Sequence, residues 1–195
     1  MVVDSPALPA VETPRLRLRC AEPRDAHALA AMMSETVSRR LASWPVPYTP
    51  SMALDRIAGV RMAAAQRRSL PLVMERRADG VVVGWISVSR APGDEATALL
   101  TYWLGEGYQG RGYMREAAPA ALAAAFEQLD VARVRAAVQG DNAASLAVVD
   151  LLGMTPLGEG RIWCPARGRE ETCLWFETPR PVAGARLAVV TAAAG

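Results

Sequence analysis

Tyr108-Gln109-Gly110-Arg111-Gly112-Tyr113-Met114 is the stretch of this sequence that most constrains its fold. It follows a predicted strand that ends at Leu104 and opens an Ala-rich segment, Met114–Leu129, that is predicted to be a helix. Glycines at this junction let the backbone approach a ligand, and the first N–H groups of the helix lack partners within it. With the positive end of the helix dipole, these groups predict a site for an anion such as a pyrophosphate. A turn that needs glycine only for its backbone conformation is the alternative.

The sequence around this stretch excludes several common chemistries. Gly110–Gly112 does not extend to G-x-G-x-x-G, and the chain has no G-K-[ST] motif. Every one of the 22 basic residues is Arg, which excludes lysine Schiff bases and a phosphate-loop lysine. His27 is the single histidine, so neither a His-based dyad nor a histidine metal cluster is expected.

Length and composition predict one soluble globular domain. The chain has 195 residues, of which 51% are hydrophobic and 22% charged, and its net charge is +2. No apolar run approaches the length of a membrane span, and no basic stripe indicates nucleic-acid binding. The three cysteines, an odd number in no metal-ligand spacing, fit a reducing compartment. We therefore expect a cytoplasmic protein with no membrane or nucleic-acid partner.

The order of the predicted elements indicates an α/β (α+β) domain with a mixed, mostly antiparallel sheet. Residues 1–13 are expected to form a flexible leader, 14–178 the single domain, and 179–195 a loosely ordered extension. Hydrophobic periodicity and turn residues predict seven strands, at 15–19, 70–76, 81–89, 96–104, 133–138, 161–164 and 172–177. About four helices are predicted, at 25–34, 51–66 (capped by Ser51), 114–129 and 143–152.

A second motif, Asp141-Asn142-Ala143-Ala144-Ser145, precedes the last predicted helix. Asn142 or Asp141 is a natural N-cap for that helix. Alternatively, the amide of Asn142 and the hydroxyl of Ser145 lie at the mouth of a cleft between neighbouring strands.

Together the two motifs resemble the GNAT family of N-acetyltransferases, in particular the branch acting on ribosomal-protein N-termini. Gln109-Gly110-Arg111-Gly112-Tyr113-Met114 is similar to the family's coenzyme A signature Q/R-x-x-G-x-G/A, with Met114 at the last position. Asn142-x-x-Ser145 with Gly153-Met154 resembles its N-x-x-S…G-F pattern. Thr13–Arg19, Trp44–Tyr48 and Tyr102–Leu104 add to a likeness that spans about residues 13–178.

This resemblance implies a GNAT fold whose fourth and fifth strands splay apart to admit acetyl-CoA, with no metal required. The residues that it assigns to the coenzyme are Tyr102, Trp103, Leu104, Gln109, Gly110, Arg111, Gly112, Tyr113, Met114, Asn142 and Ser145. Loops in relatives also suggest that Trp44, Tyr48 and Trp163 form the acceptor pocket.

The catalytic residues follow less directly from the resemblance. Many family members carry a Tyr acid seven residues after the Asn, where this chain has Val149, so Ser145 is the candidate that protonates the departing thiolate. Glu95, on the strand before Tyr102, is the candidate base, with Glu116 and Glu159 as alternatives. Carboxylates in such positions are more often solvated surface charges, and on that alternative water or no group acts as the base.

The expected function is transfer of the acetyl group of acetyl-CoA to a primary amine, with an α-amino group of a protein or peptide as the acceptor. One alternative acceptor is a small-molecule amine, amino acid or amino-sugar. A second alternative is a non-catalytic acyl-CoA-binding module. A monomer or a homodimer fits either assignment.

Overall fold

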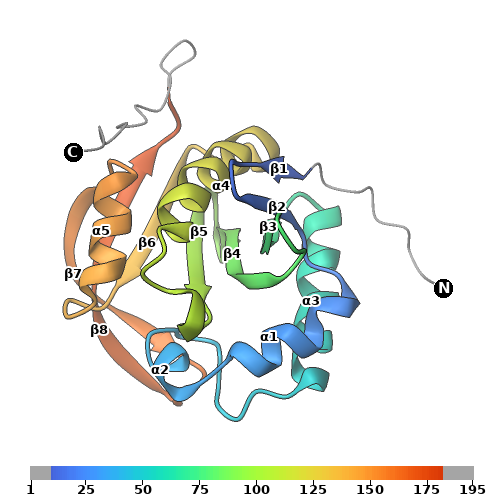
Figure 1. Ribbon diagram of the computed structural model, residues 1–195. Coiled ribbons are helices and arrows are strands. Elements are labelled where there is room, and N and C mark those ends of the chain that lie inside the picture. Colours follow the sequence, from blue (N-terminus) through green and yellow to red (C-terminus); the bar gives the residue numbers. More distant parts are fainter. Residues whose placement is uncertain (1–9, 182–195) are drawn as a thin grey trace, which may run out of the picture.

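The structure is a computed structural model that describes residues 10–181. It contains an eight-stranded sheet in the order β1-β2-β3-β4-β5-β6-β8-β7, with helices packed on both faces (Figure 1). The strands are β1 (Val11–Glu12), β2 (Leu16–Cys20), β3 (Ser69–Arg76), β4 (Val82–Ala91), β5 (Asp94–Leu104), β6 (Arg133–Val138), β7 (Thr155–Cys164) and β8 (Arg169–Pro179). The helices are α1 (Ala26–Met32), α2 (Glu35–Ser38), α3 (Pro50–Ala65), α4 (Tyr113–Leu129) and α5 (Ala143–Leu151), with short 3-10 turns η1 (Pro23–Asp25) and η2 (Glu106–Tyr108). The predicted mixed sheet, mostly antiparallel, is confirmed.

The central strands divide their apolar side chains between two cores, because successive residues of a strand point to opposite faces. Met74 and Leu104 face α4 in the larger core. Val73, Trp85 and Trp103 face α1 and α3 in the smaller one. Burying an aliphatic or aromatic side chain of this size contributes about 1.5–3 kcal/mol, so both cores fix the central strands firmly.

The sheet opens between β5 and β6, and this opening positions the candidate site. The two strands run parallel and pair only from Thr97 with Arg133 to Leu99 with Arg135. Beyond Leu99, residues 100–104 pair with β4 alone among the described strands. The predicted splay of the fourth and fifth strands is therefore confirmed; they are β5 and β6 because a short β1 precedes the predicted series.

The structure has one helix more than predicted, and a different residue caps α3. The added helix, α2, is a single turn capped by Ser34, which is too short to give a periodic apolar pattern. Helix α3 is capped by Thr49 and not by Ser51: Oγ1 of Thr49 accepts a hydrogen bond from the backbone N–H of Met52 at 3.2 Å, and Pro50 occupies the first helical position. Within residues 10–181, no helix combines the length and the apolar character that crossing a membrane would require.

Both ends of the domain extend beyond the predicted strands. Val11–Glu12, expected in the leader, forms β1 by pairing with Arg17 and Leu18, and Thr13 is buried. The rest of the predicted leader, and the predicted extension from residue 182, lie outside the described residues. The final hairpin is longer than predicted. The sequence did not indicate its full length, because β7 is an exposed edge strand whose side chains do not alternate between buried and exposed.

Candidate active site

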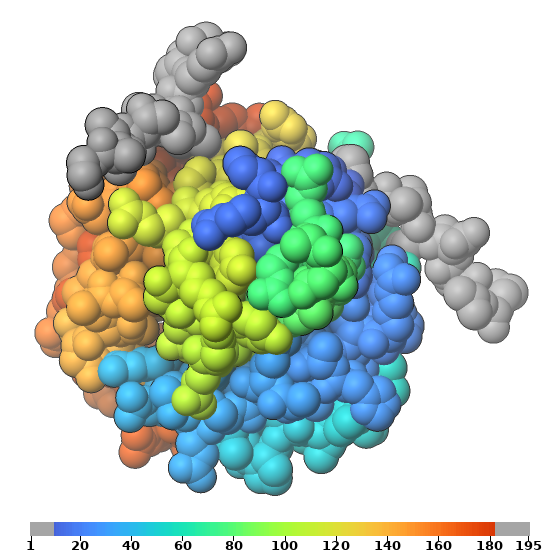
Figure 2. All heavy atoms as spheres, in the orientation of Figure 1, coloured from blue at the N-terminus to red at the C-terminus, as the bar shows by residue number. Residues whose placement is uncertain are grey.

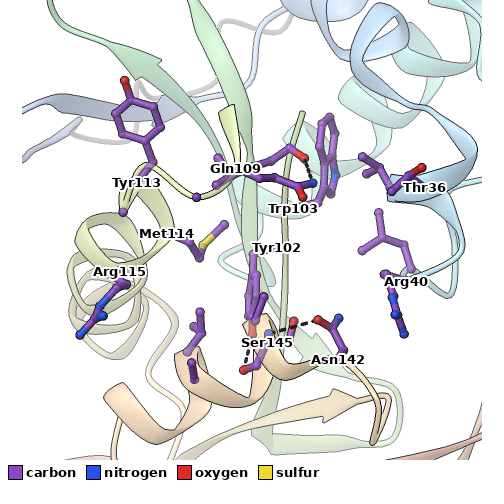
Figure 3. Close-up of a pocket in the computed structure, with 18 of the residues that line it drawn as sticks. Thr36, Arg40, Tyr102, Trp103, Gln109, Tyr113, Met114, Arg115, Asn142 and Ser145 are labelled. Atoms are coloured by element: carbon purple, nitrogen blue, oxygen red, sulfur yellow. Dashed lines mark hydrogen bonds between the residues drawn. The ribbon is translucent and has the colours of Figure 1, made fainter. Parts of the chain in front are cut away.

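A cavity of about 520 Å³ occupies the opening between β5 and β6. Figure 2 shows the segments that surround it, α2, the 105–115 region and α5, next to one another on one face. Its "loop side" consists of Gly110, Gly112, Tyr113, Met114 and Arg115, and its "α2 side" consists of Thr36, Val37, Arg39, Arg40, Leu41 and Trp103 (Figure 3). The remaining lining residues are Tyr102, Leu104, Gln109, Asn142, Ala144, Ser145, Ala147 and Val148.

The loop side presents backbone N–H groups to the cavity through two left-handed glycines. Gly110 has φ +72° and Gly112, which caps α4, has φ +76°. Residues other than glycine rarely adopt this backbone conformation, so the loop requires glycine at both positions. The side chain of Gln109 donates to the carbonyl of Leu104 at 3.1 Å and ties the loop to the end of β5. The result is a helix N-terminus suited to binding an anion.

A pair of residues that we name the loop clamp, Arg15 and Glu116, holds this loop from behind. Glu116 accepts hydrogen bonds from the hydroxyl of Thr13 at 2.6 Å and from the backbone and Nε of Arg15, both at 2.7 Å. Nη1 of Arg15 donates to the carbonyl of Arg111 at 2.9 Å, and its guanidinium stacks on Tyr113. Burial favours the neutral acid, but these hydrogen bonds outweigh it and hold the pKa of Glu116 below its ordinary value.

The start of α5 closes the base of the opening. Oδ1 of Asn142 accepts from the backbone N–H of Ser145 at 3.2 Å, so Asn142 caps α5. From β5, the hydroxyl of Tyr102 reaches across the opening and donates to the carbonyl of Ser145 at 3.3 Å (Figure 3). Burial raises the pKa of Tyr102, which keeps this phenol protonated at neutral pH.

The α2 side is held in place by a second pair, Arg167 and Glu171, which we name the α2 clamp. Arg167 Nη1 donates to the carbonyls of Ser38 at 3.2 Å and Leu41 at 3.0 Å. Its Nε and Nη2 donate to Glu171 at 2.6 and 2.7 Å, and these hydrogen bonds lower the pKa of Glu171 to about 2. The β7–β8 hairpin thereby fixes the turn that carries the lining residues of α2.

A further contact joins α2 to the α5 end of the cavity. Arg40 Nη1 donates to Asp141 at 2.6 Å and to the side chain of Gln139 at 2.9 Å. Asp141, the first residue of the second motif, therefore pairs with Arg40, whose hydrogen bond lowers the pKa of Asp141. Asn142 is the residue that caps α5.

Most residues predicted to bind the coenzyme line one cavity. Of the eleven, only Arg111 is absent from the lining, and it contributes its backbone carbonyl to the loop clamp. Gln109 and Asn142 each combine a cavity position with a structural hydrogen bond. No group of three or more His, Cys, Asp or Glu side chains placed to hold a metal occurs in the described range 10–181.

The structure does not bring the candidate bases to the cavity. Glu95 lies seven residues before Tyr102 on an extended strand, which is roughly 23 Å away. Its side chain is 65% exposed and pairs with Arg68 at 3.3 Å and Arg90 at 3.5 Å. Glu116 is committed to the loop clamp, and Glu159 is exposed on β7. Glu95 is therefore a surface charge and not the base that the sequence suggested.

The aromatic residues predicted for the acceptor pocket also lie outside this cavity. Trp44 is 1% exposed and packs against Trp85 and Trp103 in the smaller core. Tyr48 lines a separate cavity beside α3, and Trp163 is 57% exposed on β7. The side of the cavity opposite the loop is formed by the α2 side.

Sequence reasoning missed the lining residues of α2, and Arg115 on α4. The only signals for α2 were the cap Ser34 and the acidic Glu35 after it. The sequence predicts solvated charges at Arg39 and Arg40, with a position facing the ribose phosphate of the coenzyme as the alternative. Nothing local indicates that Arg167 holds their turn beside the cavity.

A splayed parallel pair, a glycine-led helix N-terminus beside it, and a cavity between them define the acetyl-CoA-dependent N-acetyltransferases of the GNAT class. The family model for the acetyltransferase (GNAT) domain matches residues 15–155, and the chain belongs to this family. The enzyme class predicted from the sequence is thus confirmed.

Individual relatives agree with this assignment. YdaF of Bacillus subtilis (strain 168), provisionally named a ribosomal N-acetyltransferase, is 25% identical over 164 residues, which is 83% of this chain and 89% of YdaF. RimJ of Mycobacterium smegmatis, solved in complex with CoA-disulfide, is 22% identical with a TM-score of 0.71 and covers 88% of each chain. The ribosomal-protein-S5-alanine acetyltransferase of Vibrio fischeri is 22% identical with a TM-score of 0.73, covering 88% of this chain and 96% of its own. The two solved structures share the fold.

Proposed function

We propose that this enzyme transfers the acetyl group of acetyl-CoA directly to the α-amino group of a protein or peptide. The observation that carries the proposal is the chemistry of the cavity lining. Among the described residues that line it, the charged side chains are the arginines Arg39, Arg40 and Arg115, with no carboxylate and no imidazole. A cavity without a side-chain base suits an amine that is already partly neutral.

Amine basicity turns this observation into a choice of acceptor. An α-amine with a pKa near 7.8 is roughly a tenth neutral at pH 7, whereas a lysine amine is neutral in only about a few parts in ten thousand. General-base help contributes about 10²–10⁴ in rate, which is the size of the lysine deficit and more than an α-amine needs. Holding amine and thioester in line can supply roughly 7–11 kcal/mol without such a base.

On this proposal, the loop side and the free edge of β5 hold the coenzyme. The amides of Gln109–Met114 bind the pyrophosphate, and the unpaired backbone of Tyr102–Leu104 pairs with the pantetheine amides. Asn142 contacts the pantetheine arm. Two hydroxyls at the base of the opening, those of Ser145 and Tyr102, are the candidate donors to the departing thiolate, and the raised pKa of Tyr102 keeps its proton available.

Relatives that carry ribosomal-protein names support a protein acceptor, although they share only about a quarter of their residues with this chain. Acetylation of a small-molecule amine is the remaining alternative, and it would use the same coenzyme-binding residues.

The test is calorimetric titration with acetyl-CoA followed by free-thiol release with three acceptors: N-terminal peptides, a blocked peptide with a single lysine, and small amines. We expect binding and faster release with free N-terminal peptides than with the lysine peptide. A preference for lysine or for small amines would reject the protein α-amine. Binding without release for any acceptor would favour the acyl-CoA-binding module.

A further inference from the structure

Trp103 carries a buried polar group that the protein itself leaves unpaired. Its side chain is only 5% exposed, and within residues 10–181 its indole N–H has no hydrogen-bond partner. Leaving a buried donor unpaired is costly, and native proteins do so rarely, so each case calls for an explanation. Trp103 differs from the other two such residues, Thr97 and Gln128, because it lines the cavity.

The ring is held rigidly, so its N–H has a fixed direction. Trp103 packs edge-on against Trp44 with ring centroids 5.0 Å apart, and the guanidinium of Arg56 lies 4.1 Å from the centroid of the Trp44 ring. Because Tyr102 and Trp103 are neighbours on a strand, they point to opposite faces of the sheet. Figure 3 shows the nitrogen-bearing edge of the indole turned toward the part of the α2 side where Thr36 lies.

A rigid, desolvated N–H at this place selects for an oxygen acceptor on the incoming amine. In every peptide N-terminus or amino-acid derivative, a carbonyl oxygen lies two bonds beyond the carbon that bears the amine. The carbon chain of a lysine ε-amine or an alkyl amine offers only methylenes there. An indole N–H only donates, so it cannot pair with an ammonium, and the lone pair of the neutral amine is needed for attack on the thioester.

We propose that Trp103 Nε1 donates a hydrogen bond to the carbonyl oxygen adjacent to the acceptor's amine, which makes Trp103 the residue that selects α-amino carbonyl compounds. This inference rests on the proposed function and names the residue behind its acceptor class. A site that pairs such an N–H discriminates strongly against analogues lacking the oxygen, because they leave the buried donor unpaired.

The experiment compares two acceptors and two variants. The acceptors are tri-alanine amide with a free N-terminus and its reduced analogue, in which the first amide CO–NH is replaced by CH₂–CH₂ so that the carbonyl oxygen is lost and no second amine is added. Trp103→Phe removes the N–H while keeping an aromatic ring, and Trp85→Phe is the matched control in the same aromatic cluster but outside the cavity lining. Each acceptor is compared with itself across variants, so the difference in amine pKa between the two compounds cancels.

We expect Trp103→Phe to lower kcat/KM for tri-alanine amide by roughly 10- to 100-fold and to change that for the reduced analogue by less than about threefold. Trp85→Phe should change the two values by the same factor and leave acetyl-CoA binding unchanged. The Kd for acetyl-CoA is also measured in Trp103→Phe, because weaker coenzyme binding would lower kcat/KM for both acceptors alike and leave the ratio between them unchanged. Wild-type enzyme, with rates expressed per neutral amine, should prefer tri-alanine amide over the analogue by a similar factor, a measurement that needs no variant to fold.

Equal losses for both acceptors in Trp103→Phe would overturn the inference, since the N–H would then serve the acetyl group or the ring's packing. An equal wild-type rate per neutral amine for the two compounds would overturn it as well. If the enzyme acetylates the peptide but gives either of these results, the inference about Trp103 fails and the proposed function stands. If it binds acetyl-CoA but acetylates no peptide, the inference and the proposed function both fail.

Discussion

The two Arg–Glu clamps on opposite sides of the cavity use the same chemistry but depend on different parts of the chain. The loop clamp joins Arg15, at the start of β2, to Glu116 in the first turn of α4, and it braces the glycine loop. The α2 clamp keeps both charges, Arg167 and Glu171, within one hairpin and reaches out to the carbonyls of a distant turn. On the proposed function, the loop clamp therefore fixes the loop that binds the pyrophosphate, and the α2 clamp fixes the side chains that face the acceptor.

This difference predicts that the two halves of the site can be damaged separately. Changes at the loop side should weaken acetyl-CoA binding and leave recognition of the amine intact. Changes at the α2 side should do the reverse.

The largest expected effect comes from the loop itself, through Gly112→Val. A β-branched residue at φ +76° costs about 1–3 kcal/mol, and the new Cβ lies 3.4 Å from Nη2 of Arg15. We expect the Kd for acetyl-CoA, measured by calorimetry, to rise roughly 10- to 100-fold. Gly93→Val is the control, because Gly93 also has φ +76° and open space around it, and it precedes β5 at the end opposite the loop. An equal rise in Kd for both variants would indicate general loss of the fold.

Breaking the loop clamp should have the next largest effect. Glu116→Gln removes the charge that binds Arg15 and the hydroxyl of Thr13, so the carbonyl of Arg111 loses its fixed partner. Charge-assisted hydrogen bonds of this kind contribute about 1.5–3 kcal/mol, part of which is retained by the amide. We expect acetyl-CoA affinity to fall about five- to tenfold, with KM for the amine within twofold.

Arg17→Leu provides the matched control for the loop clamp. Arg17 is on the same strand as the clamp, but its side chain is half exposed and pairs with the exposed Glu12. Normal acetyl-CoA affinity in Glu116→Gln, or a larger change in KM for the amine than in Kd for acetyl-CoA, would contradict the assigned role of the loop clamp.

The α2 clamp should show the opposite pattern in Glu171→Gln. With the charge removed, Arg167 holds the Ser38 and Leu41 carbonyls less firmly, and the α2 side becomes mobile. We expect KM for an N-terminal peptide to rise about three- to fivefold in steady-state assays, with acetyl-CoA affinity within twofold. Glu170→Gln is the control, since Glu170 is an exposed neighbour paired with exposed Arg161. A shift in acetyl-CoA affinity of the same size would show that the clamps are not independent.

The same contrast explains what could be read from the sequence. The loop was predicted because its signal is local: glycines, a preceding strand and a following helix lie within a few residues. The splay of β5 and β6 followed from the family resemblance of the Gln109–Met114 and Asn142–Ser145 motifs. The α2 side could not be predicted, because its position depends on Arg167, which contacts residues more than 120 positions away. Trp103 was placed on the right strand, yet its burial against Trp44 and its unpaired N–H depend on contacts distant in sequence that no local pattern predicts.

The smallest expected effect is a pH dependence of folding stability. It separates the contribution of the α2 clamp to the unfolding free energy from its effect on peptide binding. The hydrogen bond from Arg167 lowers the pKa of Glu171 to about 2 in the folded protein, below the value of roughly 4.3 for an unfolded chain. A carboxylate with a depressed folded-state pKa stabilises the fold above its unfolded pKa and loses that contribution as the pH falls toward its folded value. The difference in unfolding free energy between wild type and Glu171→Gln, from urea titrations, should therefore be constant above about pH 5.5 and shrink between about pH 4.5 and 2. A difference that instead grows with acidification would mean that Glu171 is bound more tightly as the neutral acid, and the charge-based account of the α2 clamp would fail.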